Sequence, residues 1–469
     1  MTGETILSQT ESLCPECLAR IPAQRVARGE DIYLRKACPE HGEFSSVIWR
    51  GRPVFESWVR PKIPSHPETP FTGIDKGCPY DCGLCSDHRQ HTCSVLLEVT
   101  ASCDLGCPVC FADSEVHPAP DPELATIAGW YRRVLEAGGP FNIQLSGGEP
   151  CVRDDLPQIV ALGRSLGFTF IQLNTNGLRL ARDPDYVWRL KDAGLSTVFL
   201  QFDGTRDDIH KALRGRALAD QKEAAVEHCC KHGIGVVLVP TLVPGINTNE
   251  IGAIIEYALG CAPGVRGVHF QPISYFGRYP QPPTDNARVT IPEIISAIAV
   301  QTQATMRSEN FGPPGCENAL CSFHGNFVIM PDGRPIPLTS HAAGSCCAPR
   351  PAKEGAARAR SFVATHWTAT QRTTPEAGET GAQRSEGLAG PQIVVQTNLD
   401  AWDTFLDRAK SHTFCVSGMA FQDAWTLDLE RLRDCCIHVM SPDGRLIPFC
   451  AYNLTSRRGR ALYRAESQR

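Results

Sequence analysis

Apolar and polar positions alternate in blocks through the middle of the chain. Six short apolar runs have the length of buried strands: Val95–Thr100, Phe141–Ser146, Phe168–Asn174, Thr197–Asp203, Gly235–Val239 and Gly267–Ile273. Amphipathic stretches with helical periodicity lie between them, for example Glu123–Glu136 and Asp155–Leu166. Strands that alternate with helices predict parallel βα units. Six units fall short of the eight in a closed barrel, so the sequence predicts an α/β fold with a partial (βα)6 barrel over residues 95–275.

The chain on either side of this predicted barrel has a different pattern. Residues 1–94 are rich in Cys and Pro with short strand-like runs, which indicates a Cys-rich metal-binding N-terminal region. Residues 276–469 hold further cysteines and two hairpin patterns, 327–338 and 437–449, each with Pro-Asp-Gly at its turn. Residues 343–395 have little periodicity and are rich in Ala, Gly, Thr, Arg and Pro, which predicts a flexible insertion.

Composition narrows the class of protein. The net charge of −5 over 469 residues gives no basic footprint of the kind that nucleic-acid binding needs. Residues 1–12 lack the features of a signal peptide, and no apolar run is long enough for a transmembrane segment. We therefore expect a cytoplasmic protein with no nucleic-acid partner. In that compartment the 22 cysteines stay reduced, and their grouping indicates metal ligands.

The central cysteine group directly follows the first predicted barrel strand. It comprises Cys103, Cys107 and Cys110, at the strand end where barrel enzymes place their chemistry. Spacings of three and two residues let one loop aim three thiolates at one [4Fe-4S] cluster. The fourth iron is then left open for the amino and carboxylate groups of S-adenosylmethionine. The alternative is a zinc or structural cluster loop on an α/β domain.

This loop, with Phe111 after it, resembles the signature of the radical S-adenosylmethionine superfamily. The next predicted strand ends in a motif that looks like the glycine-rich motif of that superfamily for the methionine amino group: Gly147, Gly148, Glu149 and Pro150. Glycines let backbone approach a ligand, and Glu149 is suited to hold a cationic amine. The same resemblance implies further contacts to the cofactor from later strand ends: Asn174, Gln201 and Asp203.

A second group of cysteines precedes the barrel. Four thiolates suit a closed auxiliary [4Fe-4S] cluster, with a four-thiolate zinc site as the alternative: Cys78, Cys82, Cys85 and Cys93. We interpret the nearby His88 and His91 as surface residues. A third group has the spacing of a zinc ribbon or rubredoxin-like site for one mononuclear zinc or iron: Cys14, Cys17, Cys38 and His41.

A fourth group lies in the C-terminal part of the chain. If the two hairpins pack together, four cysteines surround another cluster, with Cys415 as a competing ligand: Cys316, Cys321, Cys435 and Cys450. The region is therefore predicted to be a C-terminal auxiliary iron–sulfur region. The remaining thiols are interpreted as small buried hydrophobes: Cys151, Cys229, Cys230, Cys261, Cys346 and Cys347.

The order of these motifs resembles one multi-cluster branch of the superfamily, which includes archaeal tetraether synthase and related radical methyltransferases. The resemblance covers residues 12–342 and 411–455. It implies a rubredoxin-like mononuclear metal, the radical-generating cluster and one or two auxiliary [4Fe-4S] clusters. The chain departs from the branch at Gly418, where relatives are expected to carry Cys, with Cys415 close by as a substitute, and in the insertion.

The leading functional hypothesis is a radical enzyme that abstracts hydrogen from an unactivated C–H bond and then forms a C–C bond or transfers a carbon unit. The substrate is expected to be a small molecule, a lipid or a peptide, and the electron donor a reduced ferredoxin or flavodoxin. A peptide-modifying radical enzyme is the alternative, and a non-catalytic iron–sulfur electron-transfer protein is a third hypothesis. The sequence identifies no catalytic residue beyond the cofactor ligands.

Overall fold

The computed structural model describes residues 3–114, 120–340, 348–368 and 396–464, with only the backbone described for 396–401. Cys346 and Cys347 lie outside these residues. Six parallel strands run side by side in chain order: β6 (Ser94–Thr100), β7 (Asn142–Gly147), β8 (Ile171–Thr175), β9 (Thr197–Gln201), β10 (Gly235–Val239) and β12 (Val265–Pro272). The fold is therefore α/β with a partial (βα)6 barrel, as the sequence predicts.

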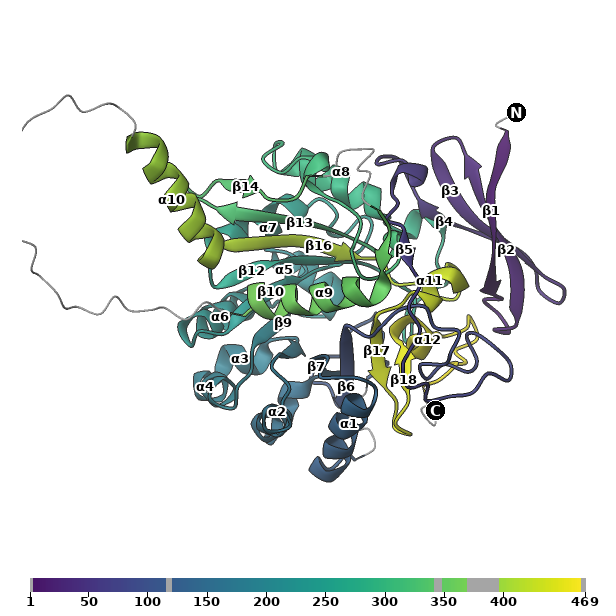
Figure 1. The fold of residues 1–469 in the computed structure, drawn as a ribbon, viewed down its shortest axis with the longest axis horizontal. Coiled ribbons are helices and arrows are strands. Elements are labelled where there is room, and N and C mark those ends of the chain that lie inside the picture. Colours follow the sequence, from purple (N-terminus) through teal and green to yellow (C-terminus); the bar gives the residue numbers. More distant parts are fainter. Residues whose placement is uncertain (1–2, 115–119, 341–347, 369–395, 465–469) are drawn as a thin grey trace, which may run out of the picture.

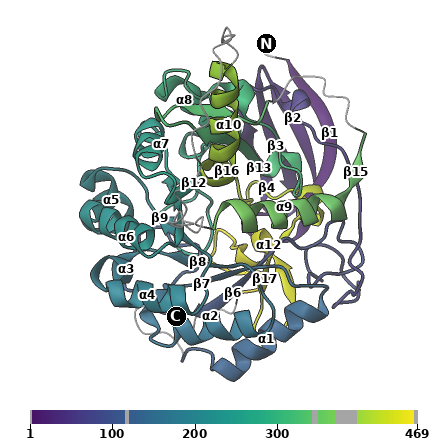
Figure 2. The ribbon, with the colours of Figure 1, turned by 60° about the vertical axis from the view of Figure 1, so that its left-hand side comes forward.

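Helices cover the outer face of these strands (Figure 2). Their bounds are α1 (Leu124–Glu136), α2 (Leu156–Ser165), α3 (Leu178–Arg182), α4 (Pro184–Asp192), α5 (Asp207–Arg214), α6 (Ala219–Lys231), α7 (Ile251–Gly260) and α8 (Ile291–Gln301). The strand side chains that face the helices are apolar and buried, whereas several that face the barrel interior are polar and line a cavity, among them Gln144, Gln172 and Asn174. Gly163 on α2 permits close packing against α1, since a Cβ there would lie 2.7 Å from Oη of Tyr131.

Further strands extend the sheet at both edges. Beyond β12 lie β16 (Thr413–Met419), β13 (Ser322–Ile329) and β14 (Pro335–Pro337); beyond β6 lie β17 (Ile437–Met440) and β18 (Leu446–Pro448); β11 (Thr241–Leu242) pairs with β12. The two predicted hairpins therefore sit at opposite edges of one sheet. The hypothesis that they pack together as neighbours is wrong. The first hairpin pairs with β16 at one edge of the sheet, and the second pairs with β6 at the opposite edge.

The N-terminal residues form a separate four-stranded antiparallel sheet of β1 (Glu4–Leu13), β2 (Arg20–Arg28), β3 (Asp31–Cys38) and β4 (Gly42–Trp49). It lies beside α11 (Leu429–Arg433) and the segment that precedes this helix (Figure 1). Arg25 donates to the carboxylate of Asp428 at 2.6 Å and 2.9 Å, and both side chains are buried. Lys36 is also buried and donates to the carbonyl of Ala424 at 2.8 Å. These contacts join the first strands to the C-terminal region.

Part of the predicted flexible insertion has regular structure. Residues Arg350–Pro351 form β15, which pairs with β5 (Lys62–Ile63), and α9 (Ala352–His366) follows. Arg360 on α9 donates to the carbonyl of Thr92 at 2.8 Å, and the carbonyl of His366 accepts from Arg266 at 2.7 Å. Both partners lie at the N-terminal ends of barrel strands, so α9 lies across that end of the barrel (Figure 2). The prediction of a flexible segment is wrong for these residues, because tertiary contacts order a helix that lacks a strong apolar pattern.

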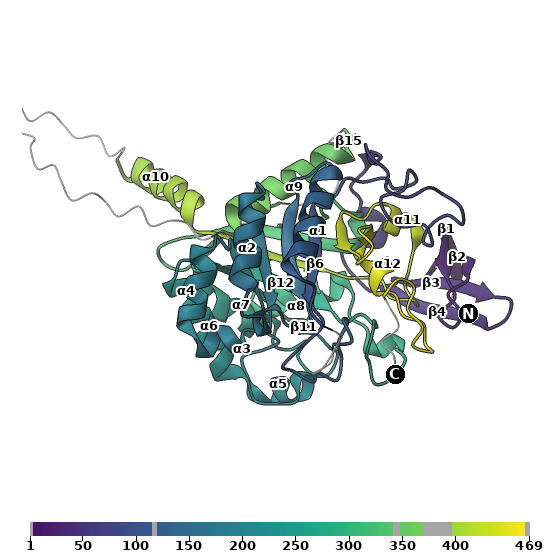
Figure 3. The same ribbon diagram turned by 90° about the horizontal axis from the view of Figure 1, so that it is seen from below.

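The remaining helices are short or peripheral. They are α10 (Gln396–Ser411), α11 (Leu429–Arg433) and α12 (Phe449–Asn453), with 3-10 turns at Phe55–Ser57, Pro150–Val152, Asp285–Ala287, Ser308–Asn310 and Ala319–Cys321. Helix α10 and the N-terminal sheet lie on opposite sides of the barrel (Figure 3). None of the helices in the described residues combines the length and apolar character that crossing a membrane requires.

Candidate functional site

The loop that carries Cys103, Cys107 and Cys110 leaves the C-terminal end of β6 and borders a large cavity inside the barrel. Its far end is fixed by paired backbone hydrogen bonds between Cys110 and Arg278, of 2.9 Å and 3.0 Å. The guanidinium of Arg278 also donates to the carbonyl of Cys107 at 3.2 Å. Burial raises the pKa of Cys103 to about 12, and a bound metal would offset this by stabilising the thiolate. The three thiols therefore lie where one cluster faces the barrel interior.

The glycine-rich motif holds this loop in place. A Cβ on Gly147 would lie 2.1 Å from the carbonyl oxygen of Thr100, and one on Gly148 would lie 2.1 Å from that of Ser102. The amides of Gly148 and Glu149 donate to the same two carbonyls, each at 2.8 Å. The sequence suggested that the glycines admit a ligand. In the structure their immediate role is to let the end of β7 approach the stem of the cysteine loop.

Glu149 is almost fully buried at the wall of the cavity. Its carboxylate accepts from Oγ1 of Thr175 at 2.6 Å and from the amides of Asn176 at 2.6 Å and Cys151 at 3.0 Å. Burial raises the pKa of this carboxyl group. Pro150 begins the short turn that follows. Three donors fix the carboxylate in one orientation, and a carboxylate has acceptor capacity left for a cationic amine.

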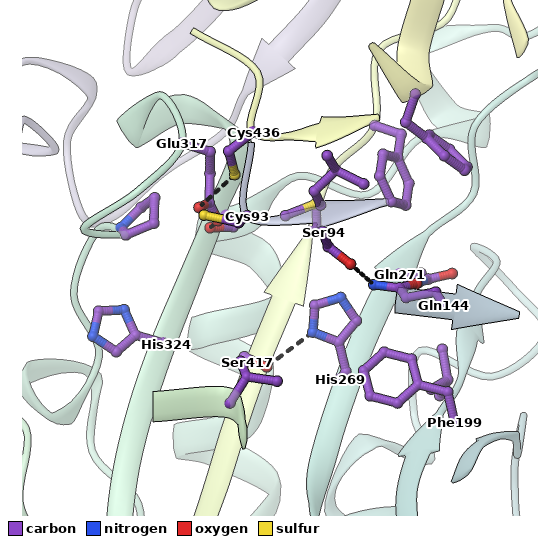
Figure 4. A pocket seen from close by; sticks show the side chains of 18 of the residues that line it. Cys93, Ser94, Gln144, Phe199, His269, Gln271, Glu317, His324, Ser417 and Cys436 are labelled. Atoms are coloured by element: carbon purple, nitrogen blue, oxygen red, sulfur yellow. Dashed lines mark hydrogen bonds between the residues drawn. The ribbon is translucent and has the colours of Figure 1, made fainter. Parts of the chain in front are cut away.

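A row of polar side chains crosses the interior of the barrel. Asn174 donates to Oε1 of Gln144 at 3.1 Å and accepts from Gln172 at 2.8 Å, and Gln144 donates to Oγ of Ser94 at 2.9 Å. These four residues come from β6, β7 and β8, and all four line the cavity. Figure 4 shows the contact between Ser94 and Gln144 beside the cavity. The row offers both donors and acceptors to a ligand that lies against it.

Gln201 and Asp203, predicted as cofactor contacts, have different surroundings. Gln201 lines the cavity, and with its amide oxygen turned toward Arg214 it accepts from the guanidinium at 3.1–3.2 Å. Asp203 is fully buried and binds Arg214 through both carboxylate oxygens, at 2.7 Å and 2.8 Å, and also accepts from the amide of Thr241. The structure places Arg214 rather than Asp203 at the cavity wall. Asp203 holds Arg214 at the cavity wall. Direct contact between Asp203 and a cofactor stays a prediction.

The cavity has a volume of about 1190 Å³ and reaches from the cysteine loop to the opposite end of the barrel. Its middle is lined by Phe199, whose ring lies 4.9 Å from Trp367 and 5.7 Å from His269 between ring centroids. His269 hydrogen bonds to Oγ of Ser417 at 2.9 Å (Figure 4). Single small-molecule sites usually occupy about 300–1,000 Å³. The cavity thus has room for two small molecules side by side.

Cys78, Cys82 and Cys85 come together in one loop. They border a small pocket with His88 and Arg433, and Cys78 and Cys82 are within hydrogen-bonding range of each other. Tyr463 anchors this loop: its hydroxyl accepts from the amide of Cys82 at 2.9 Å and donates to the carbonyl of Pro79 at 2.6 Å.

Two predictions for this part of the chain are wrong. Cys93 does not join Cys78, Cys82 and Cys85, because it immediately precedes β6 and faces the N-terminal end of the barrel. His88 is not a surface residue: it is buried and hydrogen bonds to the carbonyl of Cys435 at 2.7 Å. Burial also lowers the pKa of His88 to about 4.

The fourth cysteine group divides into two. Cys450 is buried, and Cys321 and Cys435 are partly buried. The three lie close enough that Cys450 and Cys321 help to raise the pKa of Cys435, after the larger effect of burial. Cys316 lies elsewhere, with Cys93 and Cys436, and the sulfur atoms of those three lie within 4.8 Å of one another.

Cys415 is not a competing ligand for either group. It faces Asn326 across the β13–β16 pair, whereas Cys321 lies beyond the other end of that pair, next to Ala420. Gly418, where branch members are expected to carry Cys, is tightly packed: a Cβ there would lie 2.5 Å from the ring of Phe323. Cys415 therefore does not substitute for the expected cysteine.

The N-terminal sheet brings together the four predicted ligands of a mononuclear site. The ligand atoms of Cys14, Cys17, Cys38 and His41 all lie within 4.8 Å of one another. Nδ1 of His41 is 3.5 Å from the sulfur of Cys38 and 3.8 Å from that of Cys14. A tetrahedral metal with bonds of about 2.3 Å places its sulfur ligands about 3.8 Å apart. The geometry fits one zinc or iron ion.

Sequence reasoning missed several residues that line the cavity: Ser94, Gln144, Arg214, His269, Glu317 and Cys436. The sequence placed Cys436 in the C-terminal cysteine group but not among its ligands, and only the strand register shows that Cys435 and Cys436 join different groups. Cys151 and Cys229 are buried thiols, as predicted, while Cys230 and Cys261 are partly buried.

Comparison with known proteins shows which family this chain belongs to. Residues 97–258 match the model of the radical SAM superfamily, and residues 6–50 match an HMPTM N-terminal zinc ribbon domain. The chain is 34% identical over 475 aligned residues to the 7,8-dihydro-6-hydroxymethylpterin dimethyltransferase of Methanocaldococcus jannaschii, covering 96% of this chain and 94% of that protein. A probable GTP 3',8-cyclase of Methanothermobacter marburgensis is 30% identical over 176 residues, which cover 36% of this chain and 55% of the relative.

A solved structure, Streptococcus suis SuiB bound to precursor peptide SuiA, aligns with a TM-score of 0.35 and 14% identity over 40% of this chain and 41% of that chain. At this level it carries no argument about function.

The cofactors are a radical-generating [4Fe-4S] cluster, S-adenosylmethionine, auxiliary [4Fe-4S] clusters and one mononuclear zinc or iron. When bound, the radical-generating cluster supplies the electron that cleaves S-adenosylmethionine to a 5'-deoxyadenosyl radical, which abstracts hydrogen from an unactivated C–H bond and leads to C–C bond formation or carbon-unit transfer. The chain is thus an enzyme, and the hypothesis of a non-catalytic electron carrier falls. Its full-length match makes it a member of the radical S-adenosylmethionine superfamily, in the family of the M. jannaschii pterin dimethyltransferase.

Proposed function

We propose that this enzyme methylates a reduced pterin, with 7,8-dihydro-6-hydroxymethylpterin as its substrate. The M. jannaschii relative that carries this activity in its name aligns with nearly the whole chain. The observation that carries the proposal is the polar row of Ser94, Gln144, Asn174 and Gln172 along the cavity wall. A pterin presents alternating donors and acceptors along one edge of a planar ring, and side-chain amides offer the complementary groups.

The aromatic lining supports the same substrate. Phe199 and Trp367 stand in the middle of the cavity, and His269 lies beside them. Planar rings stack on such side chains, which favours a flat heterocycle. A lipid substrate would require a long apolar tunnel, and a peptide an open groove. The cavity instead has an amide row across its interior and α9 across one end.

We assign roles to three regions. Residues 1–94 hold the mononuclear metal and the Cys78 loop, residues 95–275 form the radical barrel, and residues 276–469 complete the auxiliary sites and the cavity wall. In the barrel, Cys103, Cys107 and Cys110 hold the radical-generating cluster. The motif residues have two tasks: Gly147, Gly148 and Pro150 support that loop, and Glu149, with Asn174 and Gln201, faces S-adenosylmethionine.

A reduced ferredoxin or flavodoxin is the proposed electron donor, since the cluster must receive an electron before it cleaves the cofactor. The grouping of cysteines into metal sites supports our expectation of a cytoplasmic location, because thiols stay reduced there.

The test is anaerobic turnover of the reconstituted enzyme with S-adenosylmethionine, a strong reductant and the dihydropterin. We expect the pterin to stimulate release of 5'-deoxyadenosine. With a separate one-carbon donor present, either further S-adenosylmethionine or a reduced folate, the pterin should gain one and then two methyl groups by mass spectrometry. Gln144→Leu removes the donor and the acceptor that this side chain offers to the proposed ring. It should raise KM for the pterin about tenfold or more, because each hydrogen bond lost to the substrate costs about 1 kcal/mol. Gln221→Leu, on the exposed face of α6, is the matched control. A peptide or lipid that stimulates 5'-deoxyadenosine release while the pterin does not would refute the assignment.

A further inference from the structure

Three cysteines from distant parts of the chain meet at the N-terminal end of the barrel. Cys93 precedes β6 and Cys436 precedes β17, and because these strands are parallel neighbours the two residues lie side by side, with the amide of Cys93 donating to the carbonyl of Cys436 at 2.8 Å. Cys316 joins them from the segment before β13. All three side chains are at least nine-tenths buried. We call this set the Cys93 triad.

Surrounding residues hold the Cys93 triad in place. Helix α9 seals it on one side: Ala356 packs against the three cysteines, and its carbonyl accepts from the thiol of Cys93 at 3.5 Å. The ammonium group of Lys62 and the amide of Gln90 both donate to the carbonyl of Cys316. A backbone carbonyl held by two side-chain donors, one of them buried, indicates a built site rather than a chance meeting of thiols.

A disulfide does not account for this geometry. The sulfur atoms of Cys93 and Cys316 touch, but the Cα atoms of the two residues are 7.7 Å apart. Disulfides usually join Cα atoms separated by about 4.4–6.8 Å. Moreover, a disulfide leaves the third thiol, Cys436, without a role, whereas three converging thiolates are a typical ligand set for a soft metal centre.

The Cys93 triad faces the cavity at the end opposite to the radical loop. All three cysteines line the cavity, together with Glu317, whose carboxylate accepts from Oγ of Ser322 and from the thiol of Cys436 at 3.8 Å (Figure 4). The neighbouring Ser94 begins the polar row to which the proposed function assigns the pterin. A metal centre held here would border the substrate directly.

We propose that Cys93, Cys316 and Cys436 hold an auxiliary iron–sulfur cluster whose fourth iron faces the cavity beside Glu317 and there accepts a ring nitrogen or oxygen atom of the substrate. The assignment of Cys93, Cys316 and Cys436 as ligands depends only on the convergence of their thiols. The identity of the bound atom rests on the proposed pterin substrate. The centre orients the pterin from one end of the cavity while the radical-generating cluster lies at the other.

The test begins with metal content in the reconstituted full-length enzyme. Cys93→Ala, Cys316→Ala and Cys436→Ala should each lose about four iron and four sulfide per chain and the same electron paramagnetic resonance signal. Cys415→Ala removes a cavity-lining thiol outside the triad and should keep both. If the three variants retain full iron and sulfide, lose a single metal ion without sulfide, or show only loss of a disulfide in thiol titration, the cluster is refuted.

The open iron is tested in a variant that lacks the radical-generating cluster, Cys103→Ala with Cys107→Ala and Cys110→Ala. Addition of 7,8-dihydro-6-hydroxymethylpterin should shift the resonance signal that Cys93→Ala abolishes, and Glu317→Gln should leave this shift in place. An unchanged signal overturns substrate binding by the cluster. Because this readout needs no turnover, it is independent of whether the enzyme methylates the pterin. A triad signal that responds to cyanide but not to pterin would uphold the open iron and count against the pterin.

Discussion

Replacement of Gly148 by alanine tests how the glycine-rich motif supports the radical loop. The added methyl group would lie 2.1 Å from the carbonyl oxygen of Ser102 and 2.8 Å from that of Ala101, whereas ordinary contacts begin at 3.4 Å. Both obstacles are backbone atoms, so no side chain can rotate away. The end of β7 and the stem of the cysteine loop must therefore separate by about 1 Å.

That separation breaks two hydrogen bonds, from Gly148 to Thr100 and from Glu149 to Ser102, both 2.8 Å long. Loss of each bond costs about 1 kcal/mol, and up to about 3 kcal/mol where a buried partner stays unsatisfied. We expect a total destabilisation of about 2–4 kcal/mol. Displacement of a reacting group by about 1 Å can cost about 100-fold in rate, which corresponds to about 2.7 kcal/mol, so the loss of activity should be similar in size to the loss of stability.

The assay compares iron and sulfide content, the urea midpoint and the rate of 5'-deoxyadenosine release. Gly106→Ala is the matched control, because Gly106 lies inside the same loop, has no atom within 4 Å of its added Cβ and does not adopt a positive φ. We expect Gly148→Ala to lose the iron of the radical loop and about 100-fold in rate, and Gly106→Ala to lose neither. Equal behaviour of the two variants would show that the close approach does not control the loop.

Three further predictions concern stability. Arg214→Met leaves Asp203 buried and unpaired and should lower the free energy of unfolding by about 3–5 kcal/mol. The control, Asp332→Asn, breaks an exposed ion pair and should change the free energy of unfolding by less than about 1 kcal/mol. Equal urea midpoints of the two variants would contradict this prediction. Burial lowers the pKa of His269 to about 4, so the unfolded chain binds a proton below about pH 6.5 that the folded chain refuses. The free energy of unfolding of the wild type should therefore fall from pH 6.5 to 4 by about 1–3 kcal/mol more than that of His269→Gln. The range extends down to about 1 kcal/mol because the His269 ring borders the cavity, where solvent reduces the effect of burial. Parallel pH profiles of the two proteins would count against this prediction. Removal of the ribbon metal, or Cys38→Ser, should lower the melting temperature while cluster iron stays bound, because the four ligands join the β1–β2 connection to the β3–β4 turn. An unchanged transition would refute a structural role.

The barrel could be predicted from the sequence because its strands are short, mainly apolar runs and its helices are amphipathic. The observed β10 spans the same residues as the predicted run, Gly235–Val239, while the predicted Phe168–Asn174 begins three residues before β8. Phe168 and Phe170 are buried in the turn that precedes this strand, so their apolar character reflects core packing rather than strand pairing. Local pattern thus located the element, and tertiary contacts set its ends.

Ligand sets that lie within one loop were also readable from spacing. Cys103, Cys107 and Cys110 are close in sequence and must be close in space. Cys93 and Cys436 are not, and their meeting depends on the parallel pairing of β6 with β17. No spacing rule links residues 343 positions apart when the strand order is unknown. The same reason explains why α9 was taken for a flexible segment: its partners are the N-terminal ends of strands far away in the chain.

Strand β6 links the two ends of the cavity. Cys93 stands immediately before it and Cys103 three residues after it, and seven strand residues span about 20 Å. One rigid, buried element therefore sets the separation between the Cys93 triad and the radical loop. Ser94, the first residue of the strand, begins the polar row that lines the space between them. A substrate held by that row necessarily lies between the two ends, so its orientation decides which of its carbon atoms faces the radical.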